Sequence, residues 1–432
     1  MEEINTTTSP TEQGQQAPAA DTKKAPLFTP YQAFVVAILA LMQFTIILDF
    51  MILSPLGDIL MKTLKITDAQ FGTVVSAYAL SAGASGLLAA GFADKFDRKK
   101  LLLFFYTGFI LGTIFCGMAN SYATLLIARI VTGIFGGVVG SIGMAIITDV
   151  FSINQRGRVM GFVQMGFAAS QVLGIPIGLK IASAMGWHWT FFMVVIFGAL
   201  IGIVTVIKLK PVNEHLKLQS DKNAFMHLWH TIQKRDYRIG FLATAFLSLG
   251  GFMIMPFTTA FLVNNVNIAQ DDLSTIFFCT GIGSVIIMPL IGKISDSIDK
   301  FKLFTIGTIL AGVMVIIYTN LTPVPLWIVI MINVVMFMGI MGRMVPSVAL
   351  NSAVPGMADR GAYMSINSSL QQAAGGIGAI VAGLIVMRPD QSSPLQNFNI
   401  LGYIMVAVFL LCMYFVYRVS KIVEKKAVKA AN

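Results

Sequence analysis

Apolar residues are gathered into long runs that short polar stretches separate. A run of about 20 apolar residues can cross a hydrocarbon layer of about 30 Å as a helix. Backbone groups in such a layer need hydrogen-bond partners within their own segment, which favours helices over strands. We therefore predict twelve membrane-spanning helices. They cover residues 31–56, 70–92, 101–119, 122–148, 159–184, 188–208, 239–263, 273–293, 302–319, 326–350, 363–387 and 398–418.

A long polar stretch from Lys210 to Tyr237 interrupts these runs midway along the chain. It divides the chain into two sets of six predicted helices. The N-terminal residues are rich in Thr, Gln, Pro and Ala, which is typical of a disordered tail. The predicted organisation is a disordered cytosolic tail at 1–30, a six-helix half at 31–209, a linker at 210–238, a six-helix half at 239–418 and a cytosolic tail at 419–432.

The linker contains apolar Phe225 and Trp229 beside basic Lys234. This pattern predicts an amphipathic helix that lies on an anionic membrane surface. His227 and His230 do not have the i, i+4 spacing of a helical metal pair, and no cysteine or carboxylate cluster accompanies them. We expect no metal site.

The composition supports a membrane protein. Hydrophobic residues make up 56 % of the chain and charged residues 12 %, whereas soluble domains carry about 25 % charged residues. The mean hydropathy is +0.78. We find no nucleotide-binding loop and no extended soluble domain, which argues against an ATP-driven pump and most membrane enzymes. A polytopic membrane enzyme or sensor stays as the alternative from another class.

The cations are distributed unequally between the predicted loops. With the N-terminus inside, 24 of the 30 Lys and Arg lie on the cytoplasmic side. The opposite loops hold Lys62, Lys65 and Arg388. This bias follows the positive-inside rule and predicts a cytoplasmic (inner) membrane protein with both termini in the cytoplasm. The net charge of +10 is then explained by topology, and we expect no nucleic-acid partner.

A charged string occurs twice in the chain. Residues 90–100 and 292–302 each lie between two apolar runs, and their acidic and basic positions align at an offset of 202. The Arg-Gly pairs at 156–157 and 360–361 align at an offset of 204. Two independent matches at nearly the same offset indicate a duplicated unit. Two membrane-embedded repeats are typical of transporters.

These stretches resemble the major facilitator superfamily, over about residues 30 to 420. Residues 90–100 resemble the loop between that family's second and third helices, and 292–302 resemble its weaker copy between the eighth and ninth. Residues 128–133 resemble the family's fourth-helix arginine motif. The resemblance implies an all-α fold of twelve transmembrane helices in two pseudo-symmetric halves, which work by alternating access.

Further motifs are similar to those of the bacterial drug and sugar efflux antiporters. They are Gly174-Ile-Pro176-Ile-Gly178 in the fifth helix, the stretch 186–191, and 252–257 in the seventh helix. The glycines permit close helix contact, and Pro176 removes a backbone donor and is expected to bend its helix. We predict that Gly174, Pro176 and Gly178 form a helix-packing motif.

Ionisable side chains inside the apolar runs are the candidate coupling residues, because a charge there costs at least about 2.5–3.5 kcal/mol. Asp49 is the acid that lies well inside a run, about six residues before Pro55. Arg129 lies about seven residues after Tyr122, where its helix enters from the same face. At about 1.5 Å per residue, both lie roughly 10 Å below the outer boundary. We predict a proton-coupling pair; a static ion pair that orders the bundle is the alternative.

The resemblance implies a conformational latch at the inner face, where a charge cluster holds the two halves together when the cavity opens outward. Asp94 would orient the loop, Arg98 would bridge, and Asp149 would accept. The alternative is that these three residues are ordinary charges at the membrane interface, solvated by water and without a latch role.

Polar side chains on otherwise apolar helices are candidates for lining a substrate cavity. In a helix bundle such side chains also hydrogen-bond to neighbouring helices. Lys180 lies near the outer end of the predicted fifth helix and Arg343 in the inner third of the tenth, so each could line the cavity or extend its charge toward the interface. The candidates are Gln43, Gln164, Gln171, Asn333, Arg343, Asn367 and Gln371.

We therefore expect a secondary active transporter and not an enzyme, so no catalytic residues are assigned. Proton-coupled export of a small organic or drug-like solute is the favoured function. We expect the protein to be surrounded by membrane lipid, to use the proton gradient as its energy source and to need no cofactor. A proton symporter or a uniporter of a small metabolite is the alternative. A monomer would suffice for this activity.

Overall fold

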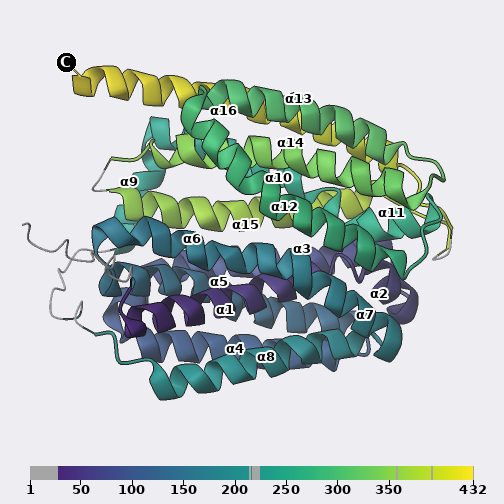
Figure 1. Ribbon diagram of the computed structural model, residues 1–432, viewed down its shortest axis with the longest axis horizontal. Helices are drawn as coiled ribbons and strands as arrows, with labels where there is room; N and C mark the ends of the chain where they lie inside the picture. The colour runs from purple at the N-terminus through teal and green to yellow at the C-terminus, as the bar shows by residue number, and fades with distance from the viewer. Residues whose placement is uncertain (1–27, 214–215, 217–223, 357–358, 391–392, 432) are drawn as a thin grey trace, which may run out of the picture.

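The computed structural model describes residues 28–213, 216, 224–356, 359–390 and 393–431 (Figure 1). The predicted all-α architecture is confirmed, because twelve helices within these ranges are long and apolar enough to cross a membrane. The β pairing recorded in these ranges is one isolated bridge between Met387 and Gln396. Most of the tail predicted at 1–30 lies outside the described residues.

The first half contains six spans, of which the fifth is composite. Its helix α6 continues through the π-helical turn η2 into α7. The bounds are α1 (Pro30–Ile52), α2 (Gly57–Leu64), α3 (Asp68–Phe92), η1 (Ala93–Lys95), α4 (Arg98–Gly117), α5 (Tyr122–Val150), α6 (Ile153–Ala169), η2 (Ser170–Gly174), α7 (Ile175–Met185) and α8 (Trp187–Lys208).

The second half repeats this plan after a linker helix, and its first span is composite. A 3₁₀ turn, η4, separates α10 from α11. The bounds are α9 (Ala224–Gln233) in the linker, α10 (Arg235–Phe252), η4 (Met255–Phe257), α11 (Thr258–Asn264), α12 (Asp272–Ser297), α13 (Lys300–Thr319), α14 (Leu326–Ser352), α15 (Arg360–Ile385) and α16 (Phe398–Ala431).

The last helix is longer than its predicted span. Helix α16 continues to Ala431, whereas the sequence pattern placed a tail from 419 onward. Val419 is buried, and Lys421 pairs with Glu424 one turn later at 2.7 Å. Apolar contact and an i, i+3 ion pair both stabilise a helix in this part of the chain.

The two copies of the charged string begin helices in the same way. The Asp97 carboxylate accepts a hydrogen bond from the Lys100 backbone N–H at the start of α4, at 3.1 Å. Asp299 accepts from the Lys302 N–H at the start of α13, at 2.8 Å. An aspartate at this position satisfies one of the free donors of a helix N-terminus. The sequence duplication is therefore also a duplication of local structure.

The bundle has two distinct ends, shown at left and right in Figure 1. The left end carries α9 and the end of α16, and we call it the terminal face. The right end carries α2 and α11, and we call it the distal face. One continuous apolar core contains Leu53 and Leu60 of the first half together with Phe261 and Leu395 of the second. Buried apolar residues thus join the halves near the distal face.

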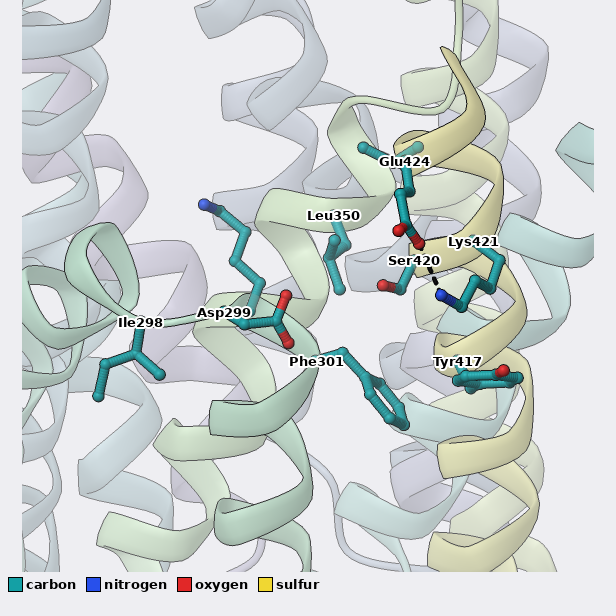
Figure 2. Close-up of a pocket in the computed structure, with 10 residues that line it drawn as sticks. Ile298, Asp299, Phe301, Leu350, Tyr417, Ser420, Lys421 and Glu424 are labelled. Carbon is teal, nitrogen blue, oxygen red and sulfur yellow. Dashed lines mark hydrogen bonds and ion pairs between the residues drawn. The ribbon is translucent and has the colours of Figure 1, made fainter. Parts of the chain in front are cut away.

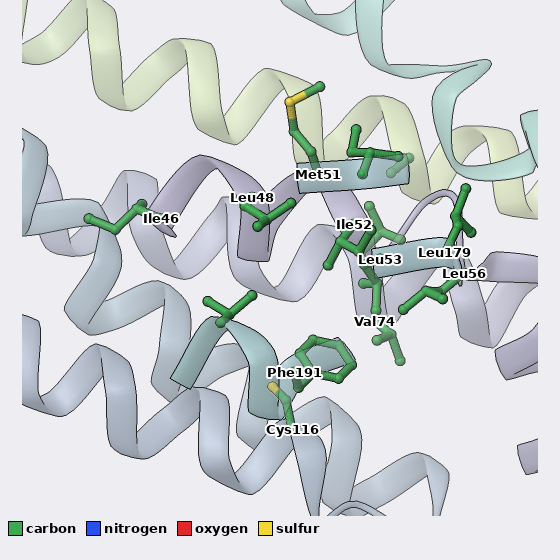
Figure 3. Packing of buried hydrophobic residues seen from close by; sticks show 14 of the residues in the cluster. Ile46, Leu48, Met51, Ile52, Leu53, Leu56, Val74, Cys116, Leu179 and Phe191 are labelled. Carbon is green, nitrogen blue, oxygen red and sulfur yellow. The ribbon is translucent and has the colours of Figure 1, made fainter. Parts of the chain in front are cut away.

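The motif at 174–178 packs the fifth span against the first. A Cβ on Gly174 would lie 2.5 Å from Leu48 Cδ1, and one on Gly178 would lie 2.8 Å from Ile52 Cδ1. Figure 3 shows Leu48 and Ile52 in this part of the core. The π-helical turn η2 ends immediately before Ile175 and Pro176, where proline removes a backbone donor. These glycines allow α1 to approach closely.

Candidate functional site

Asp49 and Arg129 form an ion pair in the interior of the first half. Asp49 lies near the end of α1, and Arg129 lies two turns into α5. Arg129 Nη1 donates to Asp49 Oδ2 at 2.7 Å and contacts the Asp49 carbonyl oxygen at 3.3 Å. Both side chains are fully buried. The structure thus brings together the two residues that the sequence placed at matched depth.

Two further side chains complete the surroundings of this pair. Thr113 of α4 donates its hydroxyl to Asp49 Oδ1 at 3.2 Å. The Tyr78 ring of α3 lies beneath the guanidinium, 4.5 Å from its central carbon to the ring centroid. A desolvated cation over an aromatic ring gains about 2 kcal/mol. The site therefore receives contributions from the first four spans, and α3 and α4 could not be assigned to it from the sequence.

The expected latch residues Arg98 and Asp149 also meet. Arg98 is the first residue of α4, and its Nε lies 3.3 Å from Asp149 Oδ2 near the end of α5. Its Nη1 donates to the Ala93 carbonyl at 3.1 Å. These contacts all lie within the first half, at the terminal face. The side chain of Asp94, the third expected member, lies outside the described residues.

The expected cavity residues are dispersed. Gln164 is exposed, and Gln43, Gln171 and Gln371 are half-buried. Asn333 is buried, and its Nδ2 donates to the Val329 carbonyl at 2.9 Å within α14.

Asn367 belongs to a polar network inside the second half. Its Oδ1 accepts from Thr244 of α10 at 2.6 Å and from Asn351 of α14 at 3.1 Å. Tyr363 of α15 donates its hydroxyl to Asn351 Oδ1. The network ties α10, α14 and α15 together, which is the helix–helix role that such residues play in membranes.

Arg343 was a candidate either for lining the cavity or for extending its charge toward the interface. It is 2 % exposed, and its guanidinium carbon lies 3.4 Å from the centroid of the Phe409 ring. The centroid of the Phe304 ring of α13 lies 5.8 Å from the same carbon. Arg343 is therefore packed inside the second half. The aromatic rings stabilise the buried cation without a cavity or an aqueous interface. Lys180 is exposed.

A charge cluster at the distal face was missed by sequence reasoning. Arg388 follows α15 in the second half, and its buried side chain pairs with Asp58 and Asp68 of the first half. Lys62 and Arg388 had been interpreted as ordinary loop cations. The signal available in the sequence was that two acids, Asp58 and Asp68, lie in the same predicted loop region as Lys62 and Lys65.

A second missed group lies at the terminal face, where α9 meets the start of α15. Lys234 donates to Asp359, and the Tyr237 hydroxyl donates to the same carboxylate at 2.7 Å. These hydrogen bonds hold the pKa of Asp359 below its ordinary value, and the carboxylate raises the pKa of Lys234. The interaction attaches the end of the linker and the start of α10 to the start of α15.

A cleft at the terminal face lies outside these groups. Figure 2 shows it at the terminal face, between the α12–α13 turn and α16, with a volume of about 510 Å³. Asp299, Phe301, Tyr417 and Lys421 line it. All its lining residues belong to the second half, so it is not a passage between the halves.

The described residues contain no cluster of three His, Cys, Asp or Glu side chains able to hold a metal.

The fold defines a class of protein: twelve membrane helices in two six-helix repeats, with a buried ion pair in one repeat. The chain belongs to the Major Facilitator Superfamily, because the profile of that family matches residues 39–247 and again 240–432. It is a multi-pass membrane transporter and not an enzyme, as expected from the sequence.

Relatives and solved structures agree with this assignment. The chain is 25 % identical to the uncharacterized MFS-type transporter YceJ of Bacillus subtilis, over 90 % of this chain and 97 % of that protein. It is 24 % identical to a probable sugar efflux transporter of Helicobacter pylori, over 63 % of this chain and 69 % of that protein. A bacterial homologue of the human lysosomal transporter Spinster, in an inward-facing conformation, has the same fold, with a TM-score of 0.73, 17 % identity, and coverage of 92 % and 98 %.

Proposed function

We propose that the chain is a secondary active exporter that exchanges a small organic solute for protons by alternating access. The observation that carries the proposal is the fully buried 2.7 Å pair of Asp49 and Arg129. A carboxyl group can bind and release a proton, whereas a guanidinium stays charged. The pair can therefore exist as a neutral salt or as a protonated acid beside a cation, which are the two states that a proton-coupling site needs.

The halves are held together at the distal face, which supports a state that opens toward the terminal face. Hydrogen bonds join Ser54 to the Met255 carbonyl, and Thr259 to the Ser54 carbonyl at 3.2 Å. These contacts and the cation bias of the sequence support our proposal that the terminal face is cytoplasmic and that both chain ends lie there. The π-helical turn η2 and the 3₁₀ turn η4 interrupt spans that contact the opposite half, and such interruptions suit movement of one half against the other.

The direction of transport and the solute are supported by a relative. The Helicobacter pylori protein is described as a probable sugar efflux transporter, and we extend export of a small organic solute to this chain. A single chain contains both repeats, so we propose a functional monomer in lipid. The proton gradient would supply the energy without a cofactor.

The test is transport in proteoliposomes with an imposed pH gradient, screened over dyes, sugars, nucleosides and lipids. We expect the parent chain to move a solute uphill in exchange for protons. Asp49→Asn should abolish uphill transport but retain downhill exchange, because the amide cannot bind a proton. Asp271→Asn, at an exposed acid at the start of α12, is the control.

Each alternative predicts a different result. If Asp49→Asn still concentrates solute with a pH gradient, the pair is a static structural element. Solute that moves in the same direction as protons would indicate symport. A solute flux that does not depend on the pH gradient would indicate a uniporter.

A further inference from the structure

Three aromatic rings connect the buried ion pair of the first half with the second half. The Tyr78 ring of α3 has its centroid 4.5 Å from the central carbon of the Arg129 guanidinium. Phe50, which follows Asp49 in α1, has its ring centroid 5.2 Å from that of Tyr78, with 34° between the planes. Phe252 of α10 lies 5.8 Å from Phe50, at 57°. Aromatic rings attract each other at centroid separations of about 4.5–7 Å, so these contacts are continuous from Arg129 to the second half.

Phe252 lies at a break in the first span of the second half. It is the last residue of α10, and the 3₁₀ turn η4 follows three residues later. Its half-buried ring packs against α15, where a Cβ on Gly375 would lie 3.0 Å from Phe252 Cδ2. The ring therefore contacts both Phe50 of the first half and α15 of its own half. A change of angle at the break would move this ring relative to Phe50.

The Arg129 guanidinium has few groups that can stabilise its charge. The ionisable side chains that interact with it are Asp49, Tyr78 and Cys116, and of these Asp49 supplies the counter-charge. When Asp49 binds a proton, Arg129 keeps its charge and loses that partner. The Tyr78 ring then becomes the main group that stabilises the buried cation. Whatever holds the Tyr78 ring in place matters more in this state.

We propose that Phe252 is a positioning residue through which the protonation of Asp49 acts on the second half. Phe252 supports Phe50, Phe50 supports Tyr78, and Tyr78 stabilises Arg129. Protonation of Asp49 therefore makes the contact between Phe50 and Phe252 more favourable, and by reciprocal linkage this contact favours protonation. The inference rests on the proposed solute–proton exchange, which requires that the proton site and the movement of the halves depend on each other.

A double-mutant cycle on the purified full chain tests this link without solute or gradient. Tm is measured in detergent for the parent, Asp49→Asn, Phe252→Leu and the double variant. Leucine keeps an apolar side chain but has no ring. Because the cation of Asp49→Asn depends on the Tyr78 ring, the combined fall in Tm should exceed the sum of the single falls by about 2 °C or more. A combined fall equal to or smaller than the sum overturns the proposal.

Two further cycles with Asp49→Asn are the controls. Phe257 forms another ring pair between the halves, with Phe71 at 6.1 Å, and Phe71 precedes Tyr78 by about 10 Å along α3. Phe257→Leu should therefore give additive falls in Tm, because substitutions this far apart act independently. Phe252→Tyr keeps the ring and should also be additive. An equal excess in the Phe257→Leu cycle would show a general effect of the interface and would overturn the proposal.

Transport in proteoliposomes gives a second readout, on chains in which Asp49 is intact. Phe252→Leu should lower the steady-state accumulation of solute driven by a pH gradient about fivefold, whereas downhill exchange should fall no more than about twofold. Phe252→Tyr should restore accumulation. A merely structural role of Phe252 would reduce accumulation and downhill exchange in proportion, and that result contradicts the proposal.

Failure of this inference is distinguishable from failure of the proposed function. A parent chain that does not exchange solute for protons contradicts the proposed function, while the unfolding cycle still measures the link between Asp49 and Phe252. An additive cycle, in a parent chain that does exchange solute for protons, overturns the role of Phe252 alone.

Discussion

Removing either partner of the Asp49–Arg129 pair should destabilise the protein, but with different dependence on pH. The two side chains are fully buried and joined at 2.7 Å, so each substitution leaves one group without its partner. In Arg129→Leu the remaining carboxyl can become neutral by binding a proton. In Asp49→Asn the remaining guanidinium cannot lose its charge. This asymmetry gives the two variants distinct signatures.

The size of each effect follows from the chemistry of the remaining group. Protonating an aspartate with an ordinary pKa of about 3.9 takes about 4 kcal/mol at pH 7 and about 1.5 kcal/mol at pH 5. Folded Arg129→Leu then binds one more proton than its unfolded chain over this range, so its stability rises as the pH falls. An unpaired buried guanidinium costs about 3–5 kcal/mol, and this cost is constant between pH 5 and 7.

The assay is thermal unfolding of the purified protein in detergent at pH 5, 6 and 7, with the parent measured alongside. The difference in Tm between Arg129→Leu and the parent should shrink as the pH is lowered, while that of Asp49→Asn should stay unchanged. Because both differences are taken against the parent, pH effects elsewhere in the chain cancel. Parallel behaviour of the two variants would refute this reasoning, since the carboxyl would then not be the group that changes protonation.

Two further predictions concern topology and the latch. Lys210→Cys and Thr322→Cys place single cysteines at exposed positions, and a membrane-impermeant reagent should reach them from opposite sides of the membrane. Lys210→Cys should react from the cytoplasmic side. Labelling of both cysteines from the same side would contradict the helix count. Arg98→Ala and Asp94→Asn should leave the protein folded but cut transport at least tenfold, because about 1.4 kcal/mol changes a conformational equilibrium tenfold. Lys100→Ala, in the first turn of α4, is the control. Normal transport by both latch variants would leave the 90–100 stretch as a topological anchor.

Helix number and the repeat were accessible from the sequence because they depend on local properties. The length of an apolar run determines whether it can span a membrane, and the offset between two charged strings is visible without a structure. The aspartates at 97 and 299 begin helices in both copies, since capping needs only nearby backbone groups. Depth along a helix also follows from residue number, which is why Asp49 and Arg129 could be paired.

Contacts that depend on the rotation and approach of helices could not be obtained in this way. Arg343, in the inner third of its predicted helix, was a candidate for the cavity or for the interface, but its environment is set by the Phe409 ring, 66 residues away in the chain and 3.4 Å away in space. Arg388 was counted as a loop cation, although its partners Asp58 and Asp68 belong to the opposite half.

The sequence by itself therefore determined that lipid surrounds this protein, that it has twelve spans and a duplication, and that Asp49 and Arg129 lie at matched depth. The tertiary structure decided which helix faces meet, and so which charges are paired across the halves and which are packed against aromatic rings. The physical reason is that hydrophobicity and capping act over a few neighbouring residues. A buried charge, in contrast, is stabilised by whatever side chain the folded bundle places within about 4 Å of it.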